Sequence, residues 1–128
     1  AFGDQAFALN LPQVGEDFYR MLHIEQTASA LADYGDKALA DGHHAAAATY
    51  YFMARDHATS LDESRRWFQS GIRALMAASL FKQAMEEARL HLGDLADDPQ
   101  SLRFLSRTAL AAGDPVAAAA YARRLVFR

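Results

Sequence analysis

The chain has 128 residues, of which 52% are hydrophobic, and it carries a formal net charge of -3 without a single cysteine. This composition supports a packed core but excludes disulfides and thiolate metal sites, and the net negative charge predicts no nucleic-acid partner. No apolar run reaches the roughly 20 residues that a membrane-spanning helix needs. Alanine dominates the apolar content and only three prolines occur, so the composition favours an all-α fold.

Residues 1–28 are expected to hold the end of one helix and then a further helix. Residues 6–12 form an apolar stretch that ends in proline, which is typical of the close of a helix. Residues 16–28 have apolar side chains at helical spacing. We interpret this stretch as the end of a preceding unit followed by a linking helix.

From residue 60 onward, capping residues predict where helices start and end. Ser60 and Glu63 have the spacing of a capping box, in which each side chain accepts a hydrogen bond from the other residue's backbone N–H. Asp98 and Asp114 each precede a proline. Aspartate favours the position before a helix, and proline favours the first helical position, where a backbone N–H would have no partner within the helix. Helices are therefore predicted to start at these three points. Glycines after apolar-periodic segments predict helix ends at Gly42, Gly93 and Gly113.

From residue 29 onward, similar residues recur in one register with two successive intervals. Ala47, Ala84 and Ala118 define these intervals, which are 37 and 34 residues long. Three further sets follow them too: Leu31, Phe68 and Leu102; Ala38, Leu75 and Ala109; and Leu39, Met76 and Leu110. One register thus predicts three helical pairs. The first interval is longer by three positions, and we expect these to lengthen an exposed loop at residues 59–62.

The first of these units resembles the tetratricopeptide repeat (TPR), a helix-turn-helix unit with a period of about 34 residues. The small residue of its first helix is Gly35, and its turn glycine is Gly42. Its second helix carries the alanine, aromatic and alanine series at Ala47, Tyr51 and Ala54. The first unit is therefore identified as TPR-like.

The other two units depart from the TPR pattern at defined positions. In the third unit, Ser106 replaces the first-helix glycine. In the second unit, Ile72, Ser79 and His91 stand where a small residue, the turn glycine and the last alanine are usual. The spacing is retained in both units.

The resemblance implies an all-α, right-handed α-α superhelix of stacked antiparallel helix pairs in one continuous solenoid domain. Its units are residues 29–62, 63–98 and a truncated 99–128, with 1–28 as the end of a preceding repeat plus the linking helix. The expected packing residues are Gly35, Gly42, Ala47, Tyr51, Ala54, Phe68, Ala84, Ala88, Leu105, Gly113, Ala118 and Ala122. Because the sequence lacks an initiator methionine and stops inside the last predicted helix, we expect a segment of a longer array.

No pattern predicts a catalytic, cofactor or metal site. His43 and His44 lie in a predicted turn and His57 lies further on, without the spacing of metal ligands. The sequence has neither a nucleophile-elbow motif nor a Gly-rich phosphate loop. The acidic cluster at 94–98 is interpreted as solvated linker charge and a helix cap. We therefore expect a protein that is not an enzyme and uses no cofactor.

The candidate partner-binding groove is the concave face, which in TPR proteins is lined by the first helix of each pair. The register places Ala32 and Asp36 on this face in the first unit. In the second and third units it places a basic set, namely Arg66, Gln69, Arg73, Arg103 and Arg107. Arginines one helical turn apart, as at 103 and 107, can present forked donors to a carboxylate. The alternative interpretation is that these arginines only solvate the surface.

The resemblance implies a non-catalytic scaffold that binds a protein or peptide partner and the neighbouring repeats of its parent chain. Diverged repeats rich in alanine and arginine are similar to the periplasmic regions of bacterial exopolysaccharide (Pel) export proteins, where the partner would be a polysaccharide-modifying enzyme. This predicts a role in biofilm formation and a periplasmic location, with the cytoplasm as the alternative. A second hypothesis is direct binding of an anionic ligand, either acidic polysaccharide or RNA, in the arginine-lined groove.

Overall fold

The computed structural model describes residues 27–126, so the features expected before residue 27 lie outside the described residues. As predicted, the described chain is all-α. Its α-helices are α2 (Ala28–Ala40), α3 (His44–Asp56), α4 (Leu61–Ala77), α5 (Phe81–His91), α6 (Pro99–Ala111) and α7 (Pro115–Val126). A short 3-10 helix, η1 (Gly93–Asp97), lies between α5 and α6.

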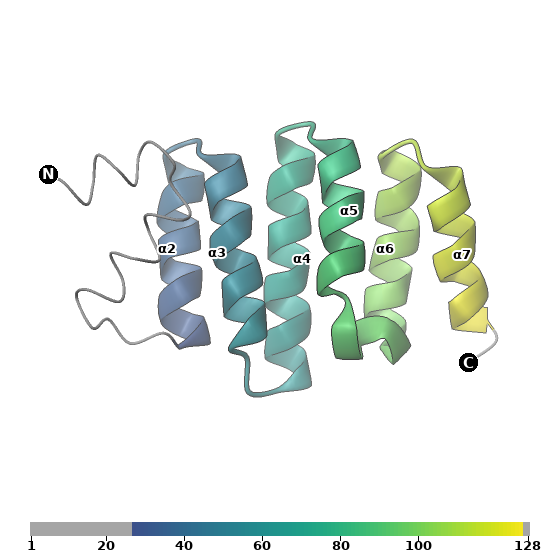
Figure 1. The fold of residues 1–128 in the computed structure, drawn as a ribbon, viewed down its shortest axis with the longest axis horizontal. Coiled ribbons are helices and arrows are strands. Elements are labelled where there is room, and N and C mark those ends of the chain that lie inside the picture. Colours follow the sequence, from purple (N-terminus) through teal and green to yellow (C-terminus); the bar gives the residue numbers. More distant parts are fainter. Residues whose placement is uncertain (1–26, 127–128) are drawn as a thin grey trace, which may run out of the picture.

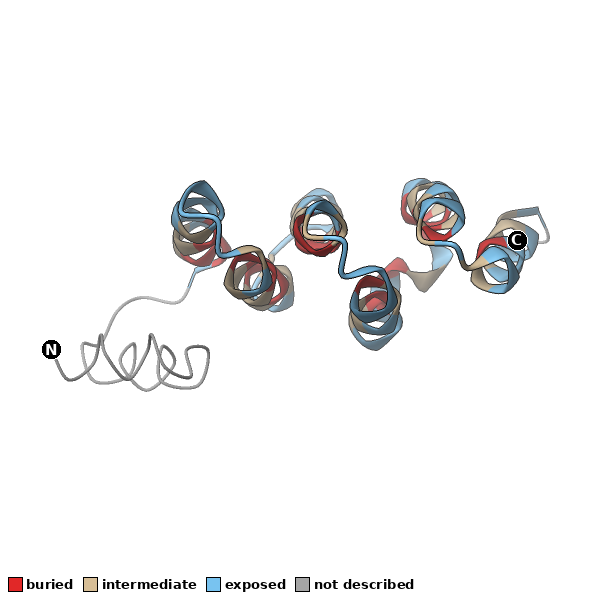
Figure 2. Cartoon of the chain, turned by 90° about the horizontal axis from the view of Figure 1, so that it is seen from above, coloured by how far each residue is buried: buried red, intermediate tan, exposed pale blue. Residues whose placement is uncertain are grey.

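The helices lie side by side in chain order, and neighbouring helices are antiparallel (Figure 1). Seen from above, α2, α4 and α6 form one row, and α3, α5 and α7 lie on its other side with the buried faces turned inward (Figure 2). The pairs α2–α3 and α6–α7 pack closely, and α3 packs equally closely on α4. The described residues thus form a domain of six helices packed in antiparallel pairs. None of these helices has both the length and the apolar character needed to cross a membrane.

The three predicted helix starts are confirmed. Ser60, Asp98 and Asp114 precede α4, α6 and α7, and each side chain accepts a hydrogen bond of 3.0 or 3.1 Å from the backbone N–H three residues further on. These bonds satisfy N–H groups that have no partner within the helix. The predicted capping box was wrong in one detail. The Glu63 carboxylate accepts a hydrogen bond of 3.0 Å from the backbone N–H of Thr59 and not from the backbone N–H of Ser60.

The turns inside the three helix pairs share one conformation. Gly42, Ser79 and Gly113 have positive φ angles of 82°, 62° and 79°. After each, a backbone N–H bonds to the carbonyl five residues earlier at 2.9 Å: His43 to Ala38, Leu80 to Leu75, and Asp114 to Ala109. These bonds close the helix end by satisfying a carbonyl that would otherwise lack a partner. The three turns follow one another in the same register as the repeated alanines of the sequence.

Substituting Ser79 with glycine is expected to stabilise the chain by about 0.5–1 kcal/mol. A side chain at positive φ costs roughly 1–2 kcal/mol, which exceeds the entropic cost of a glycine. Ser79 is exposed, so few contacts are lost. Urea denaturation followed by circular dichroism measures the change. Gly42→Ser is the matched control, because an added Cβ there meets nothing within 4 Å, and it should destabilise the chain. Lower stability of Ser79→Gly would contradict this account of the turn.

The additional residues of the second unit lengthen a helix, so the expectation of a longer loop was wrong. Helix α4 has 17 residues, whereas α2 and α6 have 13 each. It begins seven residues before Phe68, while α2 and α6 begin three residues before the matching Leu31 and Leu102. The insertion follows the Ser60 cap, so it continues the helix as an extra first turn. Ser64 of this turn is buried, which shows that the turn packs against the domain.

Glycines let aromatic rings lie directly against the backbone of a neighbouring helix. A Cβ added at Gly35 would come within 2.8 Å of the Tyr51 ring, and one added at Gly71 would come within 2.8 Å of the Phe52 ring. Tyr51 also stacks on Trp67, with ring centroids 6.1 Å apart. These contacts join α3 to α2 on one side and to α4 on the other.

Most of the predicted packing residues are buried. Those that are buried are Gly35, Ala47, Tyr51, Ala54, Phe68, Ala84, Ala88, Leu105 and Ala118. Ala122 is half-buried, and Gly42 and Gly113 lie in their turns and not in the packed interior. Buried alanines leave room for close helix packing, and each large buried side chain such as Phe68 contributes about 1.5–3 kcal/mol by leaving water.

Two arginines of α3 and α4 bind the segment between α5 and α6 through hydrogen bonds and an ion pair. Arg65 of α4 forms a two-pronged ion pair with Asp98, with Nε–Oδ2 and Nη2–Oδ1 distances of 2.8 Å each. Arg55 of α3 donates to the backbone carbonyls of His91 and Leu92, at 2.9 Å each. The carbonyls at the end of α5 are thereby satisfied by a side chain from another helix pair.

Candidate partner-binding face

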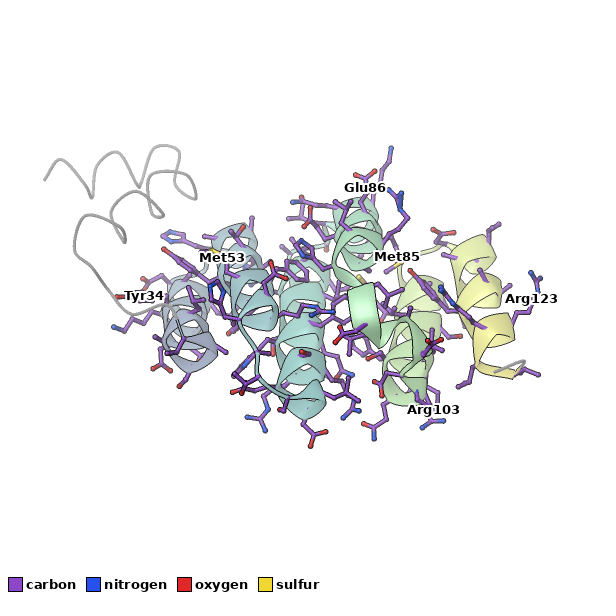
Figure 3. All side chains as sticks on the ribbon, turned by 60° about the horizontal axis from the view of Figure 1, so that its bottom comes forward. Tyr34, Met53, Met85, Glu86, Arg103 and Arg123 are labelled. Carbon is purple, nitrogen blue, oxygen red and sulfur yellow. The ribbon has the colours of Figure 1, made fainter. Side chains whose placement is uncertain are left out.

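The predicted groove residues lie on two helices of the first row that contact each other, α4 and α6. We call this set the arginine face: Arg66, Gln69 and Arg73 on α4, and Arg103 and Arg107 on α6. The four arginines are exposed, and Gln69 is half-buried. Figure 3 shows Arg103 at the edge of the array opposite to Glu86 of α5, on the outer side of the first row.

Arg73 is held in place between α4 and α6. Its guanidinium carbon lies 5.2 Å from the ring centroid of Phe104 on α6, a distance at which the ring face attracts a cation. One guanidinium nitrogen donates to Gln69 Oε1 at 3.3 Å, one turn earlier on α4. The side chain is therefore oriented before a ligand arrives, which reduces the entropy lost on binding.

Arg66 has a similar support from its own helix. Its guanidinium carbon lies 5.6 Å from the ring centroid of Trp67. Arg66 and Arg73 are seven residues apart, which is two helical turns, so they project from the same side of α4. Two guanidinium groups on this helix are thus placed over aromatic rings.

The arginine face has no internal neutralisation among residues 27–126. None of its four arginines has a carboxylate oxygen within ion-pair distance, whereas Arg55 and Arg89 each pair with one carboxylate and Arg65 pairs with two. Helix α6 contains two arginines and no acidic residue. The donors of these guanidinium groups are consequently available for carboxylates or other planar anions, which arginine binds through paired hydrogen bonds.

The first unit does not extend this face as the register predicts. Ala32 lies in the core, because its methyl group is too short to project beyond its neighbours in the way that glutamine and arginine do at the matching positions. Asp36 is exposed but accepts a hydrogen bond from the Tyr51 hydroxyl at 2.6 Å. The pKa of Tyr51 is raised well above its usual range. Burial is the largest cause, and the hydrogen bond to Asp36 and the negative charge of Asp36 add to it. Tyr51 therefore stays protonated and holds α3 to α2.

In the acidic cluster after α5, the predicted helix cap at Asp98 is confirmed, and two of the carboxylates also form ion pairs. The side chain of Asp98 is 5% exposed and caps α6 as predicted, but it also binds Arg65. The hydrogen bonds from Arg65 lower the pKa of Asp98 to about 2 against the opposing effect of burial, and bonds from Ser101 add to the shift. Asp94 pairs with Arg55 at 2.6 Å. Neither Arg55 nor Arg65 was predicted from the sequence to have these roles.

Two of the histidines contact nearby backbone carbonyls. His44 Nδ1 lies 3.1 Å from the carbonyl oxygen of Gly42, and His57 Nδ1 lies 3.0 Å from that of Met53. Within the part of the chain that the structure describes, no group of three or more His, Asp or Glu side chains is placed to hold a metal ion.

Comparison with known proteins yields no relative: no family model, no curated protein and no solved structure matches this chain.

Proposed function

We propose that the chain is part of a TPR-type, right-handed α-α superhelix and serves as a non-catalytic scaffold that binds a protein partner through the arginine face. The helical array is supported by the three turns of one conformation, which recur in the register of the sequence repeat. The binding role is supported by the arginine face on α4 and α6, whose charged side chains are all arginines.

The observation that carries the binding role is the preorganised, unneutralised Arg73. Its guanidinium spans from α4 to the Phe104 ring of α6, and no carboxylate within residues 27–126 pairs with it. Arg103 and Arg107 add two further guanidinium groups one turn apart. A chain with a net charge of -3 gathers positive charge here, so the face suits an acidic segment of a partner protein.

The face suits a peptide better than RNA or an acidic polysaccharide. Single-stranded RNA is usually held by bases stacked on open aromatic rings and by basic charge over a wide surface. Here the rings of Trp67 and Phe104 are already covered by Arg66 and Arg73. The remaining donors are few and closely spaced, which matches neighbouring carboxylates of a peptide.

The partner is best sought among bacterial exopolysaccharide export systems, the setting that the repeat composition indicates. A polysaccharide-modifying enzyme of the periplasm is the partner we propose there. The proposed scaffold role is supported by the arginine face and does not depend on a role in exopolysaccharide export.

Reversing the charge of Arg103 and Arg107 to glutamate is expected to weaken partner binding at least about tenfold. Affinity capture from a periplasmic extract of an alanine- and arginine-rich bacterium, with the natural chain and the double variant as bait, measures the loss. The matched control is Lys37→Glu, Arg123→Glu, which changes the net charge equally at the two ends of the array. Circular dichroism checks that all three forms are equally helical.

Three results would overturn the proposal. Equal capture by both variants would place binding elsewhere. Loss of the captured protein after ribonuclease treatment would favour RNA. Capture that alginate displaces, with no protein that binds after purification, would favour an acidic polysaccharide as the ligand.

A further inference from the structure

The three helix pairs are not joined to one another equally. Helix α3 packs closely along α4, so the first two pairs share an extensive contact. The third pair, α6 and α7, is also closely packed within itself, but α5 has little direct packing on α6, and α4 contacts α6 at only a few places. The third pair is therefore a well-packed unit with a weak attachment to the rest of the array.

The hydrophobic core shows the same division. One cluster of buried side chains runs through α2, α3, α4, α5 and η1, and α6 contributes Leu105 to it, with half-buried rings of α6 and α7 at its margin. Leu102, Ala109 and Ala118 are buried as well, but they lie outside this cluster. Most buried apolar side chains of the third pair thus pack separately from the main core.

The contacts that hold the third pair to α4 lie at the start and in the middle of α6. We call them the α4–α6 joint: the ion pair of Arg65 with Asp98, the contact of Arg73 with Phe104, and Leu105 in the core. The short helix η1 also contacts both α4 and α6, and it lies with the start of α6 at the lower edge of the array in Figure 1. The third pair is therefore held mainly at this end.

The opposite end of the third pair, at the α6–α7 turn, borders an open space. A hollow of about 460 Å³ lies there, lined by Ser79 and Phe81 next to the α4–α5 turn and by Ala112, Gly113 and Asp114 of the α6–α7 turn. Close packing is what makes protein interiors rigid, and side chains beside a void lose contacts on that side. Little packing at this end therefore resists movement of the α6–α7 turn.

We propose that α6 and α7 swing as one unit about the α4–α6 joint, with the largest movement at the α6–α7 turn. This is a hinge, in which a few contacts at one end join two rigid bodies. Arg73 and Arg107 lie in the turn-side halves of α4 and α6, so the swing changes the distance between the two halves of the arginine face. The swing is independent of the proposed binding role, whereas its use in fitting the face to a partner rests on that role.

Distances between pairs of spin labels test the hinge, because the chain has no cysteine and two introduced thiols are then the only labelled sites. Ala40, Ala77 and Ala111 are exposed, end α2, α4 and α6, and occupy one position of the repeat register. Ala77→Cys with Ala111→Cys measures across the joint, and Ala40→Cys with Ala77→Cys is the control across the first two pairs. Double electron–electron resonance should give a distance distribution at least about twice as wide across the joint as in the control. Equal widths would overturn the proposal.

Two further substitutions test whether the joint is what limits the swing. Asp98→Asn keeps a side-chain oxygen that can cap α6 but removes the charge that binds Arg65. Phe104→Leu removes the ring that Arg73 contacts and keeps an apolar side chain. Each variant, with helicity unchanged by circular dichroism, should widen the distribution across the joint by roughly half or more and leave the control distribution as it was. Equal widening of both distributions would mean a general loosening of the fold, and no widening in either variant would mean that other contacts hold the third pair. Either result would overturn the proposal.

Discussion

Asp98→Ala is expected to lower the free energy of unfolding by about 3–5 kcal/mol. The substitution removes both prongs of the ion pair with Arg65 and leaves a guanidinium group that is 16% exposed with only the exposed Asp62 as a partner. A largely buried charge that keeps only one exposed partner is costly, and loss of the α6 cap adds about 1 kcal/mol. Urea denaturation followed by circular dichroism measures the loss.

The matched control for this substitution is Asp114→Ala. Asp114 caps α7 with a bond of 3.1 Å but has no ion pair among residues 27–126, so its loss should cost only about 1 kcal/mol. Equal losses from the two variants would show that the pair with Arg65 adds nothing.

Acid should remove the contribution of Asp98 in a defined range of pH. The folded chain lowers the pKa of this carboxyl from 3.8 to about 2, so the stabilisation is complete above pH 3.8 and is lost as the pH falls through 2. The difference in stability between the natural chain and Asp98→Ala should therefore narrow over this range. A difference that stays constant there would contradict the pair.

Phe52→Ala is expected to cost about 3–5 kcal/mol, because a buried phenylalanine leaves a cavity that its neighbours cannot fill. The ring is 4% exposed, stacks on His91 at 4.3 Å between centroids, and meets Phe68 edge-on at 6.4 Å. On its remaining side lies the backbone at Gly71. The ring thus joins α3, α4 and α5, and thermal or urea denaturation should report the loss.

Two variants test this packing. Phe81→Ala removes a ring that is 39% exposed and should cost less than about 1 kcal/mol. Gly71→Leu should destabilise the natural chain, because its side chain would overlap the Phe52 ring, but should restore about 1–2 kcal/mol to Phe52→Ala by filling the cavity. Destabilisation by Gly71→Leu in both backgrounds would contradict this contact.

Features that depend on a few consecutive residues could be predicted from the sequence. A serine or aspartate before a helix accepts from an N–H three residues later, so Ser60, Asp98 and Asp114 mark helix starts without knowledge of the fold. Gly42 and Gly113 mark helix ends because their positive φ is accessible to glycine. Ser79 at the matching turn was found only through the repeat interval.

Features that depend on distant residues could not be predicted in this way. Arg65 and Asp98 are 33 residues apart, and no local pattern distinguishes Arg65 from the exposed Arg66 beside it. The place of the insertion depended on how the extra turn of α4 packs. The arginines of the candidate face were found from the register, but the contact of Arg73 with Phe104 required the position of α6 against α4.

The most direct test of the arginine face is isothermal titration calorimetry of the captured partner protein against three forms of the chain. The first form is the natural chain. The second is the double variant that carries both Arg103→Glu and Arg107→Glu, and the third is the double control that carries both Lys37→Glu and Arg123→Glu. We expect the Kd to rise at least about tenfold for the first variant and by less than about twofold for the control. The same Kd for all three forms would contradict a scaffold that holds its partner through the arginine face.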